Sequence, residues 1–223
     1  PDTATGSNRK ETAQEQKGAS NANYNGTSAN YSPASDSVTL NIARAASGSS
    51  YQTPYQVLYH EYGHMTDYLA ARDFGYNNYT AFTEVFNGLD ATGKALFVAG
   101  GQGGLLGQTA KGELKDRIKS IKKTHGVSTK AEAAKILIDE ITQSYSLIAR
   151  SDVSDMLEGA GIGVAYPLGV GHGKGYWKNR DNGKKIFAEI MSAEVASPDS
   201  LACIQKYFPE TYKVFRNILE VIK

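Results

Sequence analysis

Two hydrophobic patterns follow each other in the first third of the chain. Residues 37–42 (Ser-Val-Thr-Leu-Asn-Ile) alternate polar and apolar side chains, which predicts a half-buried strand. Farther along, apolar residues recur at helical spacing, and Thr53-Pro54 is typical of an N-cap followed by proline in the first turn. We therefore predict a strand followed by a helix from Pro54 to about Arg72, which ends before Gly75.

The remainder of the chain predicts mainly helices, separated by glycine- and proline-rich segments. We expect short helical segments within residues 76–98, a helix over residues 111–123, and a helix that Thr129 caps and that runs to Arg150. A short turn at residues 152–157 and a glycine-rich loop from Gly159 to Gly175 follow, and this loop could act as a lid. The last expected elements are a helix over residues 186–194 and two helices that begin at Pro198 and Pro209.

These patterns divide the chain into two parts of unequal size. Residues 1–35 are rich in Ser, Asn, Thr, Ala and Gly and predict an irregular lead-in, with an extended piece near Tyr24 to Tyr31. Residues 36–223 predict a single domain with a helical insert at about residues 76–158. The fold class is expected to be α+β, with a small sheet packed beside a helix-rich body.

Composition narrows the function classes. The chain has 223 residues, of which 40% are hydrophobic, so it can bury a substantial core. Its net charge of +1 gives no reason to expect nucleic acid or an anionic membrane as a partner. No run approaches the roughly 18 apolar residues of a transmembrane helix. The one cysteine, Cys203, excludes an internal disulfide, which fits a reducing compartment or a bacterial origin.

The most informative chemistry lies in the pentapeptide His60-Glu61-Tyr62-Gly63-His64. Residues four apart share a face of an α-helix, so the two imidazoles can bind one Zn²⁺ ion. Glu61 between them can reach a metal-bound water and act as general base. Because this HExxH motif falls inside the predicted helix, it favours a metal site over two histidines that merely face solvent.

A third protein ligand must come from another part of the chain. The longer motif HExxHxxGxxH is absent, since Met65 to Ala71 contain neither the glycine nor the third histidine. The predicted helix over residues 186–194 carries two carboxylates. Glu189 lies among apolar neighbours, where an unpaired charge is costly, whereas Glu194 near the helix end is readily explained as solvated. We therefore expect His60, His64 and Glu189 to bind zinc.

Several motifs occur in the order typical of a known family. They are Gly171-His172-Gly173-Lys174-Gly175-Tyr176-Trp177, Phe187-Ala188-Glu189, Ser192-Ala193 and the run from Lys206 to Phe215. Over roughly residues 20–222 the chain resembles the metallopeptidase-like C-terminal domain of phage minor head proteins. More distantly, it resembles the anthrax lethal factor-like gluzincin peptidases. The resemblance implies a zincin-like fold with HExxH on a central helix, zinc-dependent hydrolysis of a peptide or protein substrate, and a glutamate as third ligand.

The resemblance also implies where the protein acts and which other roles must be considered. It points to a bacterial or phage-associated protein, in the cytoplasm or the virion rather than secreted, with phage or other protein assembly partners. One alternative function is therefore a catalytically weak or inactive zincin-fold module for assembly of a phage particle. Another is a toxin-like peptidase that acts on one host protein, as lethal factor does.

One position departs from the lethal factor pattern. There the glutamate ligand lies four residues before the glutamate of Phe-Ala-Glu, and the equivalent position here is Lys185. Three interpretations follow. Glu189 itself binds the metal with Glu194 or a water behind it, the alignment slips by one helical turn, or the site has decayed.

The full hypothesis is a zinc-dependent metalloendopeptidase in which Glu61 takes a proton from the zinc-bound water and passes it to the leaving amine. Tyr176 and His172 are candidates to donate a hydrogen bond to the developing oxyanion. The alternative for Tyr176 and Trp177 is that both only anchor their loop by packing. Asp67, three residues after His64, is either a hydrogen-bond partner of a ligating histidine or a solvated acid.

Overall fold

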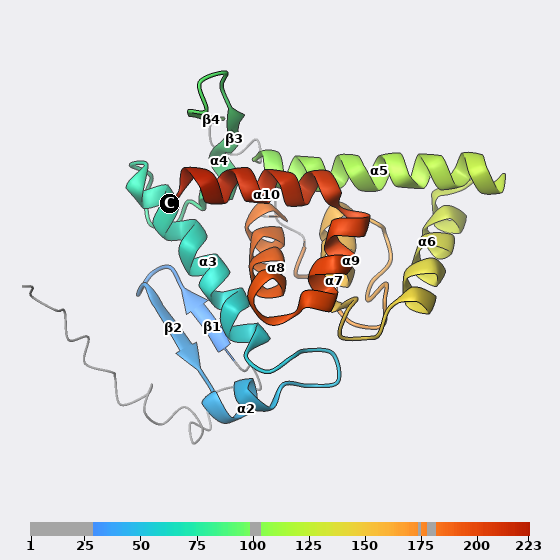
Figure 1. Ribbon diagram of the computed structural model, residues 1–223, viewed down its shortest axis with the longest axis horizontal. Coiled ribbons are helices and arrows are strands. Elements are labelled where there is room, and N and C mark those ends of the chain that lie inside the picture. The colour runs from blue at the N-terminus through green and yellow to red at the C-terminus, as the bar shows by residue number, and fades with distance from the viewer. Residues whose placement is uncertain (1–28, 99–103, 174, 178–181) are drawn as a thin grey trace, which may run out of the picture.

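The computed structural model describes residues 29–98, 104–173, 175–177 and 182–223 (Figure 1). Two short antiparallel hairpins accompany a body of helices, so the predicted α+β class is confirmed. Instead of the one small sheet that the sequence predicts, the described residues form two separate two-stranded sheets. The strands are β1 (Ala29–Ser32), β2 (Ser37–Leu40), β3 (Phe86–Leu89) and β4 (Ala95–Phe97). The helices are α2 (Ile42–Ser47), α3 (Gln56–Asp73), α4 (Phe82–Val85), α5 (Leu105–His125), α6 (Lys130–Ser144), α7 (Ser151–Ala160), α8 (Asn182–Ala196), α9 (Pro198–Tyr207) and α10 (Pro209–Val221).

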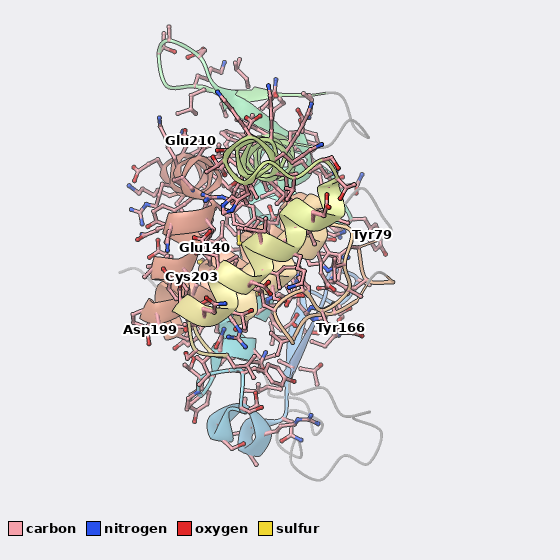
Figure 2. All side chains as sticks on the ribbon, turned by 90° about the vertical axis from the view of Figure 1, so that its right-hand side faces the viewer. Tyr79, Glu140, Tyr166, Asp199, Cys203 and Glu210 are labelled. Atoms are coloured by element: carbon pink, nitrogen blue, oxygen red, sulfur yellow. The ribbon has the colours of Figure 1, made fainter. Side chains whose placement is uncertain are left out.

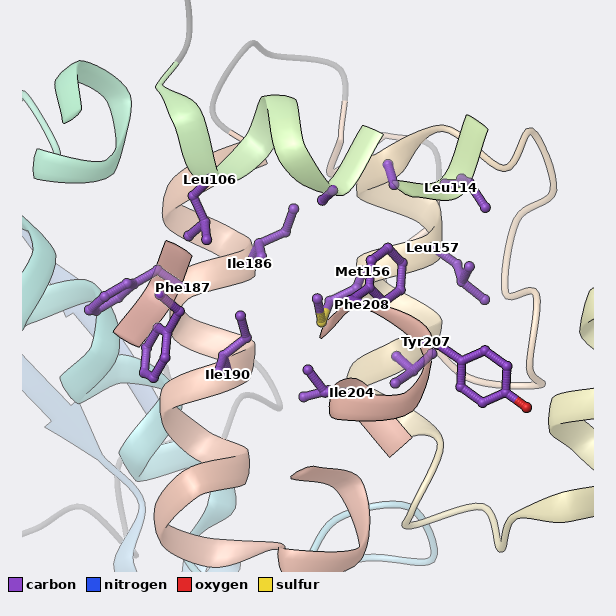
Figure 3. Packing of buried hydrophobic residues seen from close by; sticks show 14 of the residues in the cluster. Leu106, Leu114, Met156, Leu157, Ile186, Phe187, Ile190, Ile204, Tyr207 and Phe208 are labelled. Atoms are coloured by element: carbon purple, nitrogen blue, oxygen red, sulfur yellow. The ribbon is translucent and has the colours of Figure 1, made fainter. Parts of the chain in front are cut away.

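The helices pack in crossed layers beside the first hairpin. In Figure 1, α5 and α10 cross over the top of the body, α7, α8 and α9 stand beneath them, and α3 separates this body from the β1–β2 hairpin. The main core lies between α5, α7, α8 and α9, where Figure 3 shows Leu106, Met156, Ile190 and Ile204 in one cluster. Among the described helices, none is both long and apolar enough to cross a membrane.

Helix α3 approaches α8 unusually closely because a glycine lies at their crossing. A Cβ atom at Gly63 would lie 2.8 Å from the Cα atom of Ala188 and 3.2 Å from the Cβ atom of Met191. Real side chains do not tolerate such a distance to backbone, so Gly63 sets how near the two helices can lie. The glycine of the HExxH motif thus brings that motif against the helix that carries Glu189.

The start of α3 differs from the prediction. The helix begins at Gln56 rather than Pro54, and its N-cap is Tyr55 in the left-handed conformation with φ of 61°. Thr53, the predicted cap, instead donates its hydroxyl to the Ala196 carbonyl at 2.9 Å, and the Gln56 side-chain oxygen accepts from the Thr53 backbone N–H at 2.8 Å. Tertiary contact with the end of α8 therefore replaces local capping.

The first hairpin crosses the predicted domain boundary. Residues 1–28 of the expected lead-in lie outside the described residues. From Ala29 the chain forms β1, which pairs with β2 through Ala29–Leu40 and Ser32–Ser37, so the boundary at residue 35 falls inside the turn. The predicted strand ends at Leu40 rather than Ile42, because the Asn41 side chain caps α2 by accepting from the Arg44 backbone N–H at 3.1 Å.

The segment predicted to be helical at residues 76–98 forms one short helix and a hairpin. After α4, strands β3 and β4 pair with an irregularity between Phe86 and Leu89. Their turn is held by Asp90, whose side chain accepts from the backbone N–H groups of Thr92 at 2.8 Å and Lys94 at 3.0 Å. This Asx-turn chemistry, which the helical interpretation overlooked, favours the hairpin.

The prediction for residues 129–160 was wrong in two places. Thr129 caps α6 as expected, but this helix ends at Ser144 instead of Arg150. The Arg150 guanidinium donates to the carbonyls of Thr142 at 2.8 Å and Tyr145 at 2.9 Å, so it satisfies the end of α6 from outside. Residues 152–157, predicted to be a turn, belong to α7, which is buried along its whole length.

The C-terminal helices agree with the prediction. Pro198 and Pro209 each lie in the first turn of their helices, α9 and α10. Cys203 is buried within the helical body (Figure 2), as expected for a small apolar side chain. In the same view Asp199 and Glu210 lie at the outer side of these helices.

Candidate metal centre

The candidate site is a cavity of about 800 Å³ on the face of α3 that carries the HExxH motif. Its walls come from β1, α3, α7, α8 and the loop that follows α7. All the predicted site residues line this cavity: His60, Glu61, His64, His172, Tyr176 and Glu189. The structure therefore gathers side chains from three distant parts of the sequence.

His60 and Glu189 face each other across the α3–α8 crossing. The distance from His60 Nδ1 to Glu189 Oε2 is 3.4 Å, and the two side chains are 13% and 5% exposed. Two ligand atoms of one tetrahedral zinc ion lie about 3.3 Å apart, which is close to this separation. The first and third predicted ligands are thus brought together.

His64 lies beside His60 one turn farther along α3. The centres of the two imidazole rings are 4.9 Å apart, and their planes are inclined by 83°. Two imidazoles that bind one tetrahedral zinc ion have ring centres about 5 Å apart. This ring spacing is compatible with one ion. Among the described residues, however, the ligand atoms that all lie within 4.8 Å of one another are those of Asp155, His172 and Glu189, so the structure brings His64 less close to Glu189 than the predicted zinc site requires.

The electrostatics of Glu189 suit a cation. Its Oε1 atom is buried and accepts no hydrogen bond within the described part of the chain. Asp152 lies beside it, and burial together with the Glu189 charge raises the pKa of Asp152 well above its usual value. Burial opposes a charge on His60, but the Glu189 carboxylate outweighs this effect and raises the pKa of His60 to about 9. A divalent ion would neutralise these buried carboxylates, so the residues fit zinc.

Glu61 points toward the first hairpin. Its Oε2 atom accepts a hydrogen bond of 2.8 Å from the backbone N–H of Tyr31 in β1. Ala29 and Asn30 of the same strand line the cavity as well. The catalytic carboxylate predicted from the motif is thus held between the HExxH helix and the edge of β1.

Helix α7 contributes a row of buried carboxylates that the sequence interpretation missed. Asp152, Asp155 and Glu158 lie three residues apart on one face of the helix and are only 4–9% exposed. Gln56 donates to both oxygens of Asp152, at 2.9 and 3.1 Å, and thereby connects α7 with α3. The spacing Asp-x-x-Asp-x-x-Glu was the available signal, since three acids on one helical face are unusual in a segment rich in apolar residues.

His172 belongs to this row through Asp155. The distance from His172 Nδ1 to Asp155 Oδ1 is 2.8 Å. The possible metal-ligand atoms of Asp155, His172 and Glu189 all lie within 4.8 Å of one another. Burial raises the pKa of Asp155 to about 6. Asp155 is therefore a site residue that the sequence alone did not reveal.

Tyr176 is held between two other side chains. The Tyr176 ring stacks on the His172 ring, and the two ring centres are 4.0 Å apart. Lys185 Nζ lies 3.7 Å from the centre of the Tyr176 ring and forms a cation–π contact with it. Lys185 also donates to the Tyr176 carbonyl oxygen. Burial keeps the pKa of the Tyr176 phenol well above its usual value. Lys185 thus contacts Tyr176 through both its charge and its donor group.

Two other acids differ from their expected environments. Asp67 is buried. Its carboxylate accepts a hydrogen bond of 2.8 Å from the Thr83 backbone N–H and one of 2.6 Å from the Thr83 hydroxyl, so Asp67 anchors α4 and is not solvated. Glu194, also expected to be solvated, accepts from the Tyr212 hydroxyl at 2.6 Å. Both carboxylates hold neighbouring helices.

Comparisons of the chain with protein-family models, curated proteins and solved structures found no match. Function is therefore inferred from the residues that line the cavity.

Proposed function

We propose that the protein is a zinc-dependent metalloendopeptidase with a zincin-like fold, in which His60, His64 and Glu189 hold the ion. The observation that carries this proposal is the 3.4 Å approach of His60 Nδ1 to Glu189 Oε2 in the cavity that Glu61 also lines. An HExxH helix joined to a buried glutamate on a second helix is the donor set of glutamate-type zinc peptidases.

When bound, zinc supplies a Lewis acid that lowers the pKa of water toward about 7 and polarises a carbonyl group. Glu61 is the general base in this proposal. Its hydrogen bond with Tyr31 at 2.8 Å uses one carboxylate oxygen and fixes the side chain, while the other oxygen can accept a proton. Glu61 then returns this proton to the amine that leaves.

Tyr176 donates a hydrogen bond to the carbonyl oxygen as negative charge develops there. Its phenol is protonated at neutral pH, as a tyrosine ordinarily is, and burial raises its pKa further. Stacking on His172 and contact with Lys185 fix the ring, so little reorganisation is needed during the reaction.

The substrate binds in an extended conformation along β1. Ala29, Asn30 and Tyr31 line the cavity, and among the described strands only β2 pairs with β1. The Tyr31 backbone N–H already binds Glu61, so the substrate would pair with the remaining backbone groups of this strand. A peptide can add to the other edge by backbone hydrogen bonds, which recognise extended chains of many sequences. Such binding favours a peptide or protein substrate over a small molecule.

Metal content and cleavage by four proteins test the proposal. Zinc is measured by elemental mass spectrometry, and cleavage by mass spectrometry of a proteome-derived peptide library. We expect about one zinc ion per chain in the wild type, cleavage by the wild type alone, retained zinc in Glu61→Gln, and loss of zinc in His64→Ala and Glu189→Ala.

His125→Ala is the matched control, because His125 is exposed at the end of α5 and does not line the cavity. It should retain both zinc and cleavage. Equal zinc content in the wild type and His64→Ala would rule out the site, and cleavage by Glu61→Gln at the wild-type rate would rule out the base. If Glu189→Ala alone retains zinc, the third ligand is wrong.

A second candidate function is a weak or inactive zincin-fold module that acts in assembly, with phage or other proteins as partners. One observation favours it: among the described residues, the ligand atoms that lie within 4.8 Å of one another belong to Asp155, His172 and Glu189 and not to the two motif histidines. Under this alternative the wild type binds less than one zinc ion per chain, cleaves no peptide, and unfolds with the same stability as His64→Ala.

A further inference from the structure

The three carboxylates of α7 have different partners, and two of them hold the loop that carries His172. Glu158 accepts from the backbone N–H groups of Tyr166 at 2.6 Å, His172 at 3.2 Å and Gly173 at 3.0 Å, and from the Trp177 indole N–H at 3.0 Å. Asp155 accepts from the His172 backbone N–H at 3.1 Å and contacts its ring at 2.8 Å. The backbone and the side chain of His172 are thus both fixed to α7.

The orientation of the imidazole follows from these contacts. An ionised carboxylate only accepts hydrogen bonds, so the ring nitrogen beside Asp155 carries the proton. Tyr176 stacks on the ring at 4.0 Å and holds its plane. Nδ1 faces α7, which leaves Nε2 on the opposite edge of a side chain that is 44% exposed and lines the cavity.

From this geometry we propose that His172 contacts the scissile peptide group of the substrate through Nε2, and that Asp155 is the positioning residue that fixes the ring for this contact. The inference rests on the proposed peptidase function and extends it. Asp155 acts only through His172, whereas His172 touches the substrate and is a catalytic residue.

Stability alone does not explain this arrangement. Asp155 and Glu158 are only 8% and 9% exposed, and burying a charged group is costly even when it is well hydrogen-bonded. Apolar residues commonly fill a buried position at no loss of stability. Two buried acids that bind one cavity-facing residue are better explained by the need for a fixed histidine ring.

Nuclear magnetic resonance tests the positioning role without substrate. The chain has four histidines, so the ring ¹⁵N resonances of His172 are assigned by their disappearance in His172→Asn. We expect the wild type to show His172 with Nδ1 protonated. Asp155→Asn removes the anionic acceptor while preserving shape, and we expect it to shift His172 toward protonation at Nε2. The control Asp139→Asn changes an exposed acid on α6 and should leave the spectrum unchanged.

Kinetics then test the contact with substrate, with a quenched fluorescent peptide derived from a site cleaved in the library. We expect Asp155→Asn to lower kcat about 10- to 100-fold and His172→Asn about 100-fold or more, with KM within about threefold of the wild type and zinc content unchanged. Because a cavity remains in His172→Gly, added imidazole should restore part of its kcat. Asp155→Glu, which retains the acceptor, should be less impaired than Asp155→Asn.

The outcomes separate the two proposals. If Asp155→Asn retains the wild-type tautomer of His172 and the wild-type kcat, the positioning role is wrong. If His172→Asn retains kcat, or if imidazole fails to raise the kcat of a folded, zinc-loaded His172→Gly, the contact with substrate is wrong. If the zinc-loaded wild type cleaves no peptide, the peptidase function fails and the catalytic role of His172 fails with it, while the spectrum still decides whether Asp155 orients the ring.

Discussion

The cavity has two walls that are held together by different forces. We call α3 and α8 the helix-pair wall, and α7 with residues 161–173 and 175–177 the loop wall. The helix-pair wall depends on close packing at Gly63, where a Cβ atom would lie 2.8 Å from Ala188 Cα. The loop wall depends on Glu158, which binds four donors. One wall is thus fixed by shape and the other by hydrogen bonds to a buried charge.

The difference matters because the two walls have different tasks in the proposed reaction. Zinc ligands must stay about 3.3 Å apart, and rigid helix packing maintains such a distance well. Substrate contacts must form and break, and a loop on a helical base can do so while its residues remain oriented. Changes to the two walls should therefore have different consequences.

The largest effect is expected from Glu158→Ala in the loop wall. It leaves three backbone N–H groups and the Trp177 indole N–H without their acceptor, so we expect a loss of about 3 kcal/mol in the free energy of unfolding. Trp177 is the only tryptophan, so its fluorescence reports on this loop directly and should shift to longer wavelength.

The control for this change is Glu220→Ala, at an exposed position where the carboxylate pairs with Lys223 three residues along the chain. It should change stability by less than about 0.5 kcal/mol. Loss of zinc in Glu158→Ala with unchanged tryptophan emission would contradict the division into two walls.

The second effect concerns Gly63→Ala in the helix-pair wall. Alanine favours a helix by about 1 kcal/mol over glycine, but the overlap with Ala188 forces α3 and α8 apart. We expect a net loss of about 2 kcal/mol in urea unfolding and weaker zinc binding by calorimetry. Trp177 emission should stay unchanged.

Gly112→Ala tests the same chemical change without the packing. Gly112 is exposed in the middle of α5, and a Cβ atom there would meet nothing within 4 Å. The free energy of unfolding of this variant should rise by about 0.5–1 kcal/mol. A gain of similar size in Gly63→Ala would mean that the glycine does not set the approach of the two helices.

The two walls also differ in how far their residues could be predicted. HExxH and the apolar surroundings of Glu189 led directly to side chains that the structure brings within 3.4 Å. The sequence does not identify Asp155 as a site residue, because it predicts a turn at residues 152–157, where an acid is expected to be exposed. Charged residues indicate exposed segments, and only the partners supplied by a distant loop and by α3 make their burial on α7 possible.

Contacts between distant residues also explain most differences between the predicted and the observed elements. Capping and proline signals located α6, α9 and α10 at their starts, because these depend on neighbouring residues. The start of α3 was misplaced because Thr53 bonds to Ala196, which is 143 residues away. The β3–β4 hairpin was missed because the Asp90 turn was not recognised among helical signals. Local signals predict local features, and tertiary contacts override them.

A third, smaller effect concerns the link between the walls. Gln56 on α3 donates to both oxygens of Asp152 on α7, and Ser200 donates to Asp152 Oδ2 at 2.6 Å. Gln56→Met preserves the length of the side chain but removes this donor. Because Ser200 still donates to Asp152, we expect the free energy of unfolding, measured with urea, to fall by only about 1.5 kcal/mol. Gln143→Met on the exposed side of α6 is the control, and an equal loss there would show that Gln56 is not a specific link.

The smallest effect is the pH dependence that Asp67, a buried acid of the helix-pair wall, gives to the free energy of unfolding. Asp67 on α3 accepts its hydrogen bonds from the neutral backbone N–H and hydroxyl of Thr83. Burial raises its pKa from 3.8 to about 7, although the Thr83 hydrogen bonds oppose the shift. The folded state therefore holds a proton that the unfolded chain loses, so this contribution is complete below pH 3.8 and disappears as the pH rises through about 7.

Urea unfolding of the wild type and Asp67→Asn at several pH values measures this contribution. Relative to the variant, whose amide has no proton to lose, the wild type should lose up to about 1.4 kcal/mol between pH 5 and pH 6. Asp90→Asn is the control, because Asp90 lies on an exposed turn and its pKa is lowered by hydrogen bonds. Parallel pH profiles for the wild type and Asp67→Asn would mean that Asp67 stays ionised in the fold. The Thr83 hydrogen bonds would then suffice to hold a buried charge, as the loop donors hold Glu158, and the two walls would be alike in this respect.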